Sequence, residues 1–443
     1  MKKEEYIKAV LEQVRCSAVH EPLKKELEAH IDDQAEAFIA VGLPEENAEE
    51  EAVKTMGDPI ETGVGLDAAH RPRVPGTVFA AAAVLMLLGA VMRYMLAPYF
   101  EFVEGGIGDI AALPLGIGAA VLFYFLDYTA FARFPKTAYV AFVILMGVGM
   151  FGVINITDIL NRGDGTVIQI TGLRETARQI AFYGSMLLVP FMCGFAFSMR
   201  GKGFGGFVLT CLALVVPPAF IALYAPCVSA LVLSGIYALA VMTIAVKNGF
   251  FKVRKRAAHL FMYIPALLAA AGVTALKIWR DSRNEHMGVG WEQDYVRGII
   301  SGAKLFGRGN VESEFLTNAN DAHLLTAVIA QCGLAAGALT ALAVTALPIA
   351  MLIMSGRVQN SFGRLTAFSI GIVFMLQAVW FLSANIGVTT ALESYVTAPF
   401  MSGGGFNAIA CGILVGIFAS VYRRKDLMPE RKLDTGRPAK KVT

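Results

Sequence analysis

Residues 204–246 read FGGFVLTCLALVVPPAFIALYAPCVSALVLSGIYALAVMTIAV, and no Asp, Glu, Lys or Arg interrupts them. A transmembrane helix needs about 20 consecutive apolar residues to cross the hydrocarbon core of a bilayer. The stretch is therefore long enough for two crossings, with the short uncharged link Leu223–Pro226 between them. We predict two membrane-spanning helices, at 204–224 and 227–246.

The same pattern recurs along most of the chain from Pro75 onward. The run 322–354 exceeds one bilayer thickness, so we expect it to tilt or to end in an amphipathic turn. The fold class that we predict is all-α: a polytopic membrane domain of about ten transmembrane helices over residues 74–425. Besides the two helices above, the predicted spans are 75–97, 107–127, 138–158, 178–198, 257–278, 322–354, 365–387 and 405–422.

Composition agrees with a membrane protein and excludes two other classes. Hydrophobic residues make up 56% and charged residues 16% of the 443 residues, and the mean hydropathy is +0.58. Soluble domains carry about 25% charged residues, so a water-soluble enzyme is excluded. The net charge of +3 is too small to indicate nucleic acid as a partner. The six cysteines are scattered without a CxxC pair, which indicates core residues rather than disulfides or a metal site.

Basic residues in the short loops indicate the orientation of the helices. Alternate loops carry Lys and Arg, whereas the link Leu223–Pro226 and residues 388–404 carry none. By the positive-inside rule the basic loops are cytoplasmic. We therefore expect a multi-pass protein of the bacterial cell membrane with cytoplasmic N- and C-termini. The basic loop residues are Arg133, Lys136, Arg200, Lys202, Lys247, Lys252, Arg254, Lys255, Arg256, Arg357, Arg364, Arg423, Arg424 and Lys425.

Residues 1–73 differ from the rest by their charge and their helical periodicity. Apolar positions, with His30 among them, recur every three or four residues from Leu23 to Ile39, which predicts an amphipathic helix that Gly42 ends. A second, acidic helix follows and ends at a Gly-Asp-Pro sequence. We expect a small cytosolic helical domain ahead of the membrane domain.

The pattern of residues 1–73 resembles the permease prefix domain that precedes bacterial membrane proteins. The matching residues are Glu26…His30-Ile31 and Ala52-Val53…Met56-Gly57-Asp58-Pro59. The resemblance indicates no chemistry, and we expect residues 1–73 to bind a cytosolic partner that the sequence does not identify. At the other end of the chain, we expect residues 426–443 to form a disordered cytosolic tail.

The longest connection on the predicted outer side, about 279–321, holds most of the polar candidates. It reads GWEQDYVRGIISGAKLFGRG over 290–309. The first half predicts a short interfacial helix with Trp291 at headgroup depth. The glycines after it predict a flexible turn in which Lys304 and Arg308 bind a phosphate group. The alternative is an interfacial helix followed by a glycine loop with solvated charges.

Asp321 lies where the predicted helix 322–354 begins. It is the only acidic residue between Glu314 and Glu393. A carboxylate at the rim of a transmembrane bundle is costly to desolvate, and partial desolvation suits it to general-base chemistry. The alternative role is a helix N-cap, for which Asp is a favoured residue. The nearby His323 is equally compatible with an interfacial polar position.

Three segments resemble, in order, the SEDS family of shape, elongation, division and sporulation proteins (FtsW, RodA and SpoVE), which are integral-membrane peptidoglycan glycosyltransferases. The family's extracellular loop is matched by Trp291, Gln293, Ser301-Gly302 and Gly307-Arg308-Gly309. Its His-Thr-Asp-Phe stretch resembles Ala319-Asn320-Asp321-Ala322, and its Pro-Phe-Ile-Ser-x-Gly-Gly resembles Pro399-Phe400-Met401-Ser402-Gly403-Gly404. Its Pro-Ser-Glu-x-x-Lys resembles Leu173-Arg174-Glu175-Thr176-Ala177-Arg178. Ten spans with both termini inside are also the family's layout.

The resemblance implies an enzyme that polymerises lipid II, an undecaprenyl-linked disaccharide-peptide, at the outer face of the membrane. Asp321 would be the general base that deprotonates the acceptor sugar hydroxyl, and undecaprenyl pyrophosphate would be the leaving group. Cationic side chains would neutralise the developing charge. The substrate-binding candidates are Trp291, Gln293, Arg297, Ser301, Lys304, Arg308, Glu175, Arg178, Pro399 and Ser402.

Cofactor and partner expectations follow from the same resemblance. No cofactor is certain: a divalent cation is an alternative source of positive charge, but one carboxylate does not define a metal site. The implied protein partner is a class B penicillin-binding protein, a transpeptidase. Glu175 and Arg178 have an alternative role as a structural ion pair or as a snorkelling arginine.

The chain also departs from the family pattern. Counted back from Gly333, the family's aspartate position falls on Ala322, so Asp321 is one residue out of register, about 100° of helix rotation. The His-Thr before the aspartate and the proline before Glu175 are absent. These departures favour a second hypothesis: a non-catalytic membrane scaffold, or a permease-like transporter of a lipid-linked precursor, with a partner-binding cytosolic domain.

Overall fold

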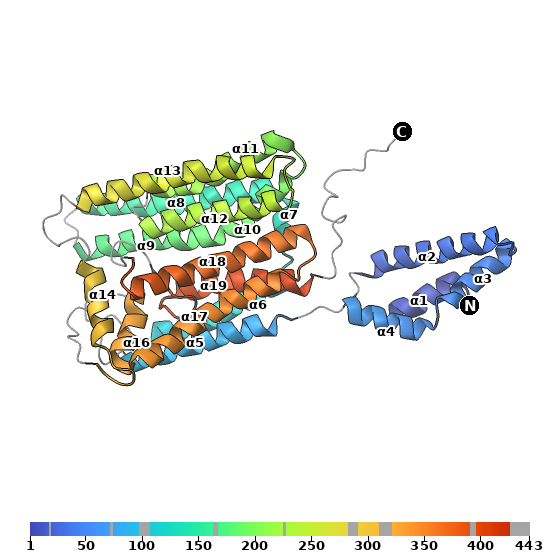
Figure 1. The fold of residues 1–443 in the computed structure, drawn as a ribbon, viewed down its shortest axis with the longest axis horizontal. Coiled ribbons are helices and arrows are strands. Elements are labelled where there is room, and N and C mark those ends of the chain that lie inside the picture. The colour runs from blue at the N-terminus through green and yellow to red at the C-terminus, as the bar shows by residue number, and fades with distance from the viewer. Residues whose placement is uncertain are drawn as a thin grey trace. The chain divides into compact units, whose positions relative to one another are not determined.

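The computed structural model describes residues 1–16, 19–70, 74–96, 107–162, 167–224, 227–281, 291–309, 321–389 and 396–425. These residues are mainly helical and include no β-strand, which confirms the predicted all-α class (Figure 1). The chain divides into two compact units, built on Met1–Val74 and on Pro75–Tyr422. We refer to them as the N-terminal unit and the membrane unit.

The N-terminal unit is a four-helix module with its own apolar core. Its helices are α1 (Lys3–Gln13), α2 (His20–Ala40), α3 (Glu45–Thr55) and α4 (Pro59–His70). Tyr6 and Val10 of α1 pack against Ile31 of α2 in this core. The Arg15 guanidinium lies 2.8 Å from the Asp67 carboxylate, which joins the end of α1 to α4.

The helix that periodicity predicts in this unit is present as α2, and its glycine stop is confirmed. Gly42 has a φ of 101°, which residues with a Cβ rarely adopt. The predicted apolar stripe is wrong at two positions, because the buried face of α2 is the narrower row Leu23, Leu27 and Ile31. The two wrongly predicted positions are His30, which is exposed, and Ile39, which is 42% exposed.

The membrane unit consists of long helices that run roughly along one direction, with the short α14 across one end of them (Figure 1). Each predicted span coincides with one helix or with two consecutive helices. The elements are α5 (Gly76–Leu96), α6 (Ile107–Phe125), α7 (Ala130–Arg133), α8 (Pro135–Arg162), α9 (Val167–Leu187), α10 (Val189–Ser198), α11 (Gly203–Tyr224), α12 (Val228–Lys247), α13 (Lys255–Asp281), α14 (Trp291–Gly302), η2 (Asp321–His323), α16 (Leu324–Cys332), α17 (Leu334–Ser355), α18 (Ser361–Asn385) and α19 (Gly405–Arg423).

Length and hydropathy confirm a polytopic membrane protein. Within the described residues, seven helices are long and apolar enough to cross a bilayer, in α5, α8, α11, α12, α17, α18 and α19. Helices α9 and α10 meet at a bend of 43° and form an eighth span when they are taken together. Helices α6 and α13 cover the two remaining predicted spans.

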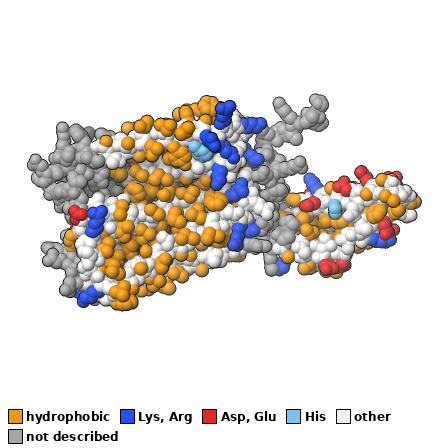
Figure 2. All heavy atoms as spheres, in the orientation of Figure 1, with side chains coloured by type: hydrophobic (Ala, Val, Ile, Leu, Met, Phe, Trp, Pro, Cys, Tyr) orange, Lys and Arg blue, Asp and Glu red, His pale blue; other side chains and the backbone are white. Residues whose placement is uncertain are grey.

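The outer surface of the membrane unit is apolar. Figure 2 shows hydrophobic side chains spread over the long helices, and Lys and Arg gathered toward the end at which α7 lies. Leu87, Leu145 and Leu268 are each more than 60% exposed. Such a surface suits the hydrocarbon of a bilayer, because large exposed apolar patches are rare on soluble monomers.

Helices α18 and α19 form the centre of the bundle. Their apolar segments are 61% and 78% buried, against 33% for α5 and 22% for α8. Helix α18 packs against α10, α12 and α17, so segments far apart in sequence meet around it. The polar loops at the ends of α18 and α19 are therefore anchored on the most rigidly packed part of the fold.

The long run 322–354 was predicted to be one helix that tilts or ends in an amphipathic turn, but it is broken at Gly333 into α16 and α17. This glycine has φ 94° and ψ 173°, a combination that is essentially restricted to glycine. A Cβ at this position would lie 2.7 Å from the carbonyl oxygen of Leu305 and 2.9 Å from that of Lys304. The break therefore arises from the close approach of the preceding loop, which hydropathy alone does not reveal.

We expect Gly333→Ala to destabilise the membrane unit by about 2 kcal/mol or more, because alanine meets both the backbone restriction and the loop carbonyls. The measurement is the thermal unfolding midpoint of the purified protein in detergent. Gly235→Ala is the matched control, since nothing lies within 4 Å of a Cβ at that position in α12. Equal midpoints for the two variants would contradict this explanation of the break.

Candidate functional site

Most of the predicted site residues gather at the end of the bundle that α14 crosses. Helix α14 packs against α16, and η2 packs against both α16 and α18. Gly387, just after α18, lies so close to α14 that a Cβ there would be 2.7 Å from the Gln293 carbonyl oxygen. The structure thus brings together α14, the start of α16 and the end of α18.

The glycine loop after α14 is docked on the break between α16 and α17. Leu334 N donates to Lys304 O at 2.9 Å, and Ala335 N donates to Leu305 O at 3.1 Å. In the other direction, the amides of the loop glycines donate to α16: Gly307 N to Cys332 O at 3.0 Å and Gly309 N to Ala330 O at 3.2 Å. The predicted flexible, backbone-exposing turn is therefore wrong, because these four hydrogen bonds use its backbone.

The cationic side chains of this region remain at the surface. Lys304, Arg308 and Ser301 are exposed. Arg297 Nη1 lies 3.4 Å from Asp294 Oδ1, in an ion pair whose side chains are 60% and 76% exposed. An exposed pair of this kind contributes little to stability, so the guanidinium can exchange its partner for an anionic ligand.

Asp321 begins the short η2 helix directly before α16. Its side chain lies outside the described residues, as do those of Trp291 at the start of α14 and Glu175 in α9. Arg178 is half-buried on α9, which packs against α8, α10 and α12 rather than being part of the loops before α16 and α19. Glu175 and Arg178 thus lie on a helix that packs in a different part of the bundle from α14, α16 and the loop before α19.

A buried Glu–His pair lies at the junction of α14 and η2. Glu292 Oε1 and His323 Nε2 are 3.1 Å apart, and the side chains are 4% and 1% exposed. Sequence reasoning missed Glu292 and assigned no role to His323. The signal was present, because Glu292 stands four and seven residues before Val296 and Ile299, the buried face of α14.

Asn385 at the end of α18 joins η2 and α16 to the centre of the bundle. Its Oδ1 accepts from Thr326 N at 2.9 Å, and its Nδ2 donates to Ala322 O at 2.6 Å. These are backbone groups at the N-terminus of α16 and in η2, which helix geometry leaves without intrahelical partners. One buried amide thereby positions the backbone on either side of His323.

The loop before α19 is held by a second amide network. Asn407 Nδ2 donates to Ala398 O and to Ser402 O, both at 3.0 Å. The Ser402 hydroxyl accepts from Ala398 N at 2.7 Å, and Gln377 Nε2 donates to Thr397 Oγ1 at 2.9 Å. The predicted substrate-binding residues Pro399 and Ser402 are both buried, so Ser402 shapes the loop.

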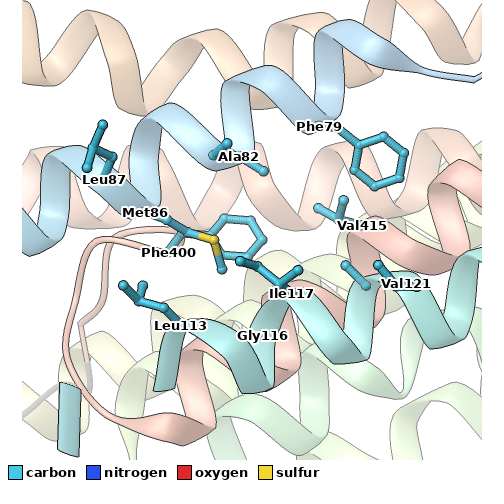
Figure 3. Close-up of a pocket in the computed structure, with 12 residues that line it drawn as sticks. Phe79, Ala82, Met86, Leu87, Leu113, Gly116, Ile117, Val121, Phe400 and Val415 are labelled. Atoms are coloured by element: carbon cyan, nitrogen blue, oxygen red, sulfur yellow. The ribbon is translucent and has the colours of Figure 1, made fainter. Parts of the chain in front are cut away.

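An apolar groove of about 390 Å³ opens beside this loop (Figure 3). It lies between α5, α6 and α19 and is lined only by apolar residues, with Met86 and Phe400 close together in it. Phe400 has a φ of 61°, an uncommon value for a residue with a Cβ. Leu87 and Ile117 at the groove are more than half exposed, so the groove opens toward the apolar outer surface.

Arg93 of α5 lies beside the same loop. It is 9% exposed, and a Cβ on Gly403 would overlap its guanidinium. A charged side chain buried in a membrane bundle is costly and is usually functional. Sequence reasoning did not select Arg93, although it is the only charged residue in the predicted span 75–97.

The described residues hold no group of three or more His, Cys, Asp or Glu side chains that could bind a metal ion. Charged side chains among the described residues at this site include Arg93, Glu292, Asp294, Arg297, Lys304 and Arg308. A divalent cation stays a prediction from the family resemblance.

We expect Asn385→Leu to leave the Thr326 amide and the Ala322 carbonyl without partners, at about 1–3 kcal/mol for each buried group. The thermal midpoint should fall, and hydrogen exchange at the start of α16 should accelerate. Ser383→Ala is the control, because it removes a half-buried hydroxyl from the same helix without touching α16. Unchanged exchange in Asn385→Leu would contradict the positioning role of Asn385.

Solved structures with a similar fold are known. No protein-family model matches the chain, and no curated protein matches its sequence. A solved structure that reports the structural coordination of polymerization and crosslinking by a peptidoglycan synthase complex contains a similar chain. It shares 18% sequence identity with a TM-score of 0.53, over 79% of this chain and 97% of that one.

Two crystal structures of the Thermus thermophilus rod-shape-determining protein RodA, one of them a point mutant, are also similar. The mutant structure gives 17% identity and a TM-score of 0.48 over 79% of this chain and 97% of that chain. The other gives 17% identity and a TM-score of 0.46 over 79% and 96%. The chain has the fold of a component of a peptidoglycan synthase complex, as its resemblance to the SEDS family predicts for a divergent member.

Proposed function

We propose that this protein is a peptidoglycan glycosyltransferase that polymerises lipid II at the outer face of the bacterial membrane. The observation that carries the proposal is the convergence of the resembling segments. Residues 291–309 dock on the break at Gly333, and η2, which contains Asp321, packs against α16 and α18. The fold shared with a chain of a peptidoglycan synthase complex supports the same assignment.

The proposed reaction uses Asp321 as general base. Its carboxylate takes the proton of the acceptor sugar hydroxyl, whose oxygen then attacks the anomeric carbon of the donor. The bond from that carbon to the diphosphate oxygen breaks, and undecaprenyl pyrophosphate leaves with the electron pair. Arg297 of α14 and Lys304 and Arg308 of the loop that docks on α16 and α17 are exposed cations. In the proposed reaction they stabilise the charge of the leaving group.

The apolar groove supports a lipid-linked substrate. A polyprenyl chain is a flexible hydrocarbon, and the groove offers only apolar side chains between α5, α6 and α19. Phe400, one of its lining residues, belongs to the loop that also contains Ser402. A chain in this groove would thus enter from the lipid and end beside the loop that precedes α19.

The proposed partner is a class B penicillin-binding protein. The similar chain comes from a complex that couples polymerization with crosslinking, and a glycan polymerase needs a transpeptidase to crosslink its product. We propose that the N-terminal unit binds a different, cytosolic partner. Its acidic helix α3, which contains five Glu residues in its first seven positions, favours a basic surface on that partner.

A non-catalytic scaffold, or a transporter of a lipid-linked precursor, is the second candidate. This candidate is favoured because Ser402 and the backbone of 304–309 form hydrogen bonds within the protein. These groups are therefore already used in holding the loops rather than in binding a substrate. The one-residue offset of Asp321 from the family register favours it as well. The two candidates differ in whether purified protein forms glycan strands.

We expect the purified full chain to convert lipid II into glycan strands, and Asp321→Asn to lower the rate about 100-fold or more, as loss of a general base does. Gel separation of labelled glycan measures both. Asp127→Asn, at an exposed carboxylate between α6 and α7, is the control. Wild-type activity that Asp321→Asn leaves unchanged would remove Asp321 from this role, and no polymerisation under any condition would favour the scaffold.

We expect Ala83→Trp, which fills the groove, to raise the KM for lipid II several-fold, since a hydrocarbon chain loses its apolar contacts at about 25 cal/mol per Å². Val84→Trp is the matched control, because Val84 is exposed on the same helix but does not line the groove. Steady-state kinetics with lipid II separate KM from kcat. Equal KM values for both variants would exclude the groove as the polyprenyl site.

A further inference from the structure

The buried pair Glu292–His323 joins two segments that are 31 residues apart in the chain. Glu292 lies in the first turn of α14, and His323 ends η2 and precedes α16. Figure 1 shows α14 crossing the bundle end next to α16. Because Oε1 and Nε2 are only 3.1 Å apart, the pair ties α14 to the element that begins with Asp321.

Burial makes this pair sensitive to the loss of either member. Both side chains are less than 5% exposed, and a buried charge without its partner is strongly unfavourable. The N-terminal end of α14 favours a carboxylate, whereas the N-terminal end of α16 disfavours an imidazolium. Loss of His323 would therefore leave the Glu292 carboxylate buried without this partner.

A buried amide also attaches η2 to the centre of the bundle. Among the described residues, Asn385 positions Ala322 O on one side of His323 and Thr326 N on the other. That amide attaches η2 to α18. The Glu292–His323 contact attaches it to α14 as well.

We infer that Glu292 and His323 are positioning residues: together they hold η2, the element that begins with Asp321, against α14. This inference rests on the proposed function for its catalytic consequence, but not for its structural one. Neither side chain is exposed enough to touch substrate, so both act through Asp321.

The test compares Glu292→Gln, His323→Gln and the exchanged pair Glu292→His/His323→Glu in the purified full chain. For each single variant we expect hydrogen exchange in 292–301 and 322–328 to accelerate several-fold. We expect kcat for lipid II to fall on the order of 100-fold, as misplacement of a catalytic group by about 1 Å does, with KM within about twofold. The exchanged pair should recover most of both losses, which a merely volume-filling role would not produce.

Asp67→Asn is the matched control, since it makes the same acid-to-amide change at a buried, paired carboxylate in the N-terminal unit. It should accelerate exchange only in the N-terminal unit, at the Arg15 amide and in α4. If Glu292→Gln does not fold, Glu292→Asp keeps the charge, shortens the reach and should show the same exchange pattern. Unchanged exchange around η2 in the single variants would overturn the inference, whereas an inactive wild type would overturn only the proposed function.

Discussion

The structure depends on one constraint: within a bilayer, every backbone amide and carbonyl needs a partner inside the protein. Continuous helices meet this requirement by themselves. The bundle nevertheless contains a broken helix at Gly333 and an irregular loop at 396–404. Both are tolerated because other parts of the chain supply the missing hydrogen bonds, and both occur at the end of the bundle where the candidate site lies.

Buried amide side chains supply many of these partners. Asn385 bonds the backbone of η2 and α16, and Asn407 bonds the backbone of the loop that contains Phe400. At the start of α18, Asn360 accepts from the amides of Phe362 and Gly363 at 2.9 and 3.2 Å. An uncharged amide can donate and accept at once, so it satisfies two backbone groups without the cost of burying a charge. Within the described residues of the membrane unit, the buried Asp, Glu, Lys and Arg side chains are Arg93 and Glu292.

The predicted fold followed from local patterns, and the errors arose where distant segments meet. The spans in α11 and α12 were predicted within a few residues because apolar length is a property of the segment itself. The helix 322–354 was predicted unbroken because nothing within it shows that the carbonyls of Leu305 and Lys304 lie against Gly333. The turn 301–309 was predicted flexible for the same reason. Glu292 was missed because a carboxylate on the apolar face of a short helix was interpreted as part of an interfacial segment.

The amino-acid sequence by itself determined that the chain is an all-α membrane protein with a helical N-terminal unit, and it located the segments around Asp321 and Pro399. Hydropathy, helical period and motif spacing act over one or two turns, so they can be evaluated without the fold. The tertiary structure alone decided which polar groups are joined: the docking of 304–309 on α16, the amide of Asn385, and the contact of Glu292 with His323. These contacts depend on how α14, α16 and α18 pack, and packing is a property of the assembled bundle.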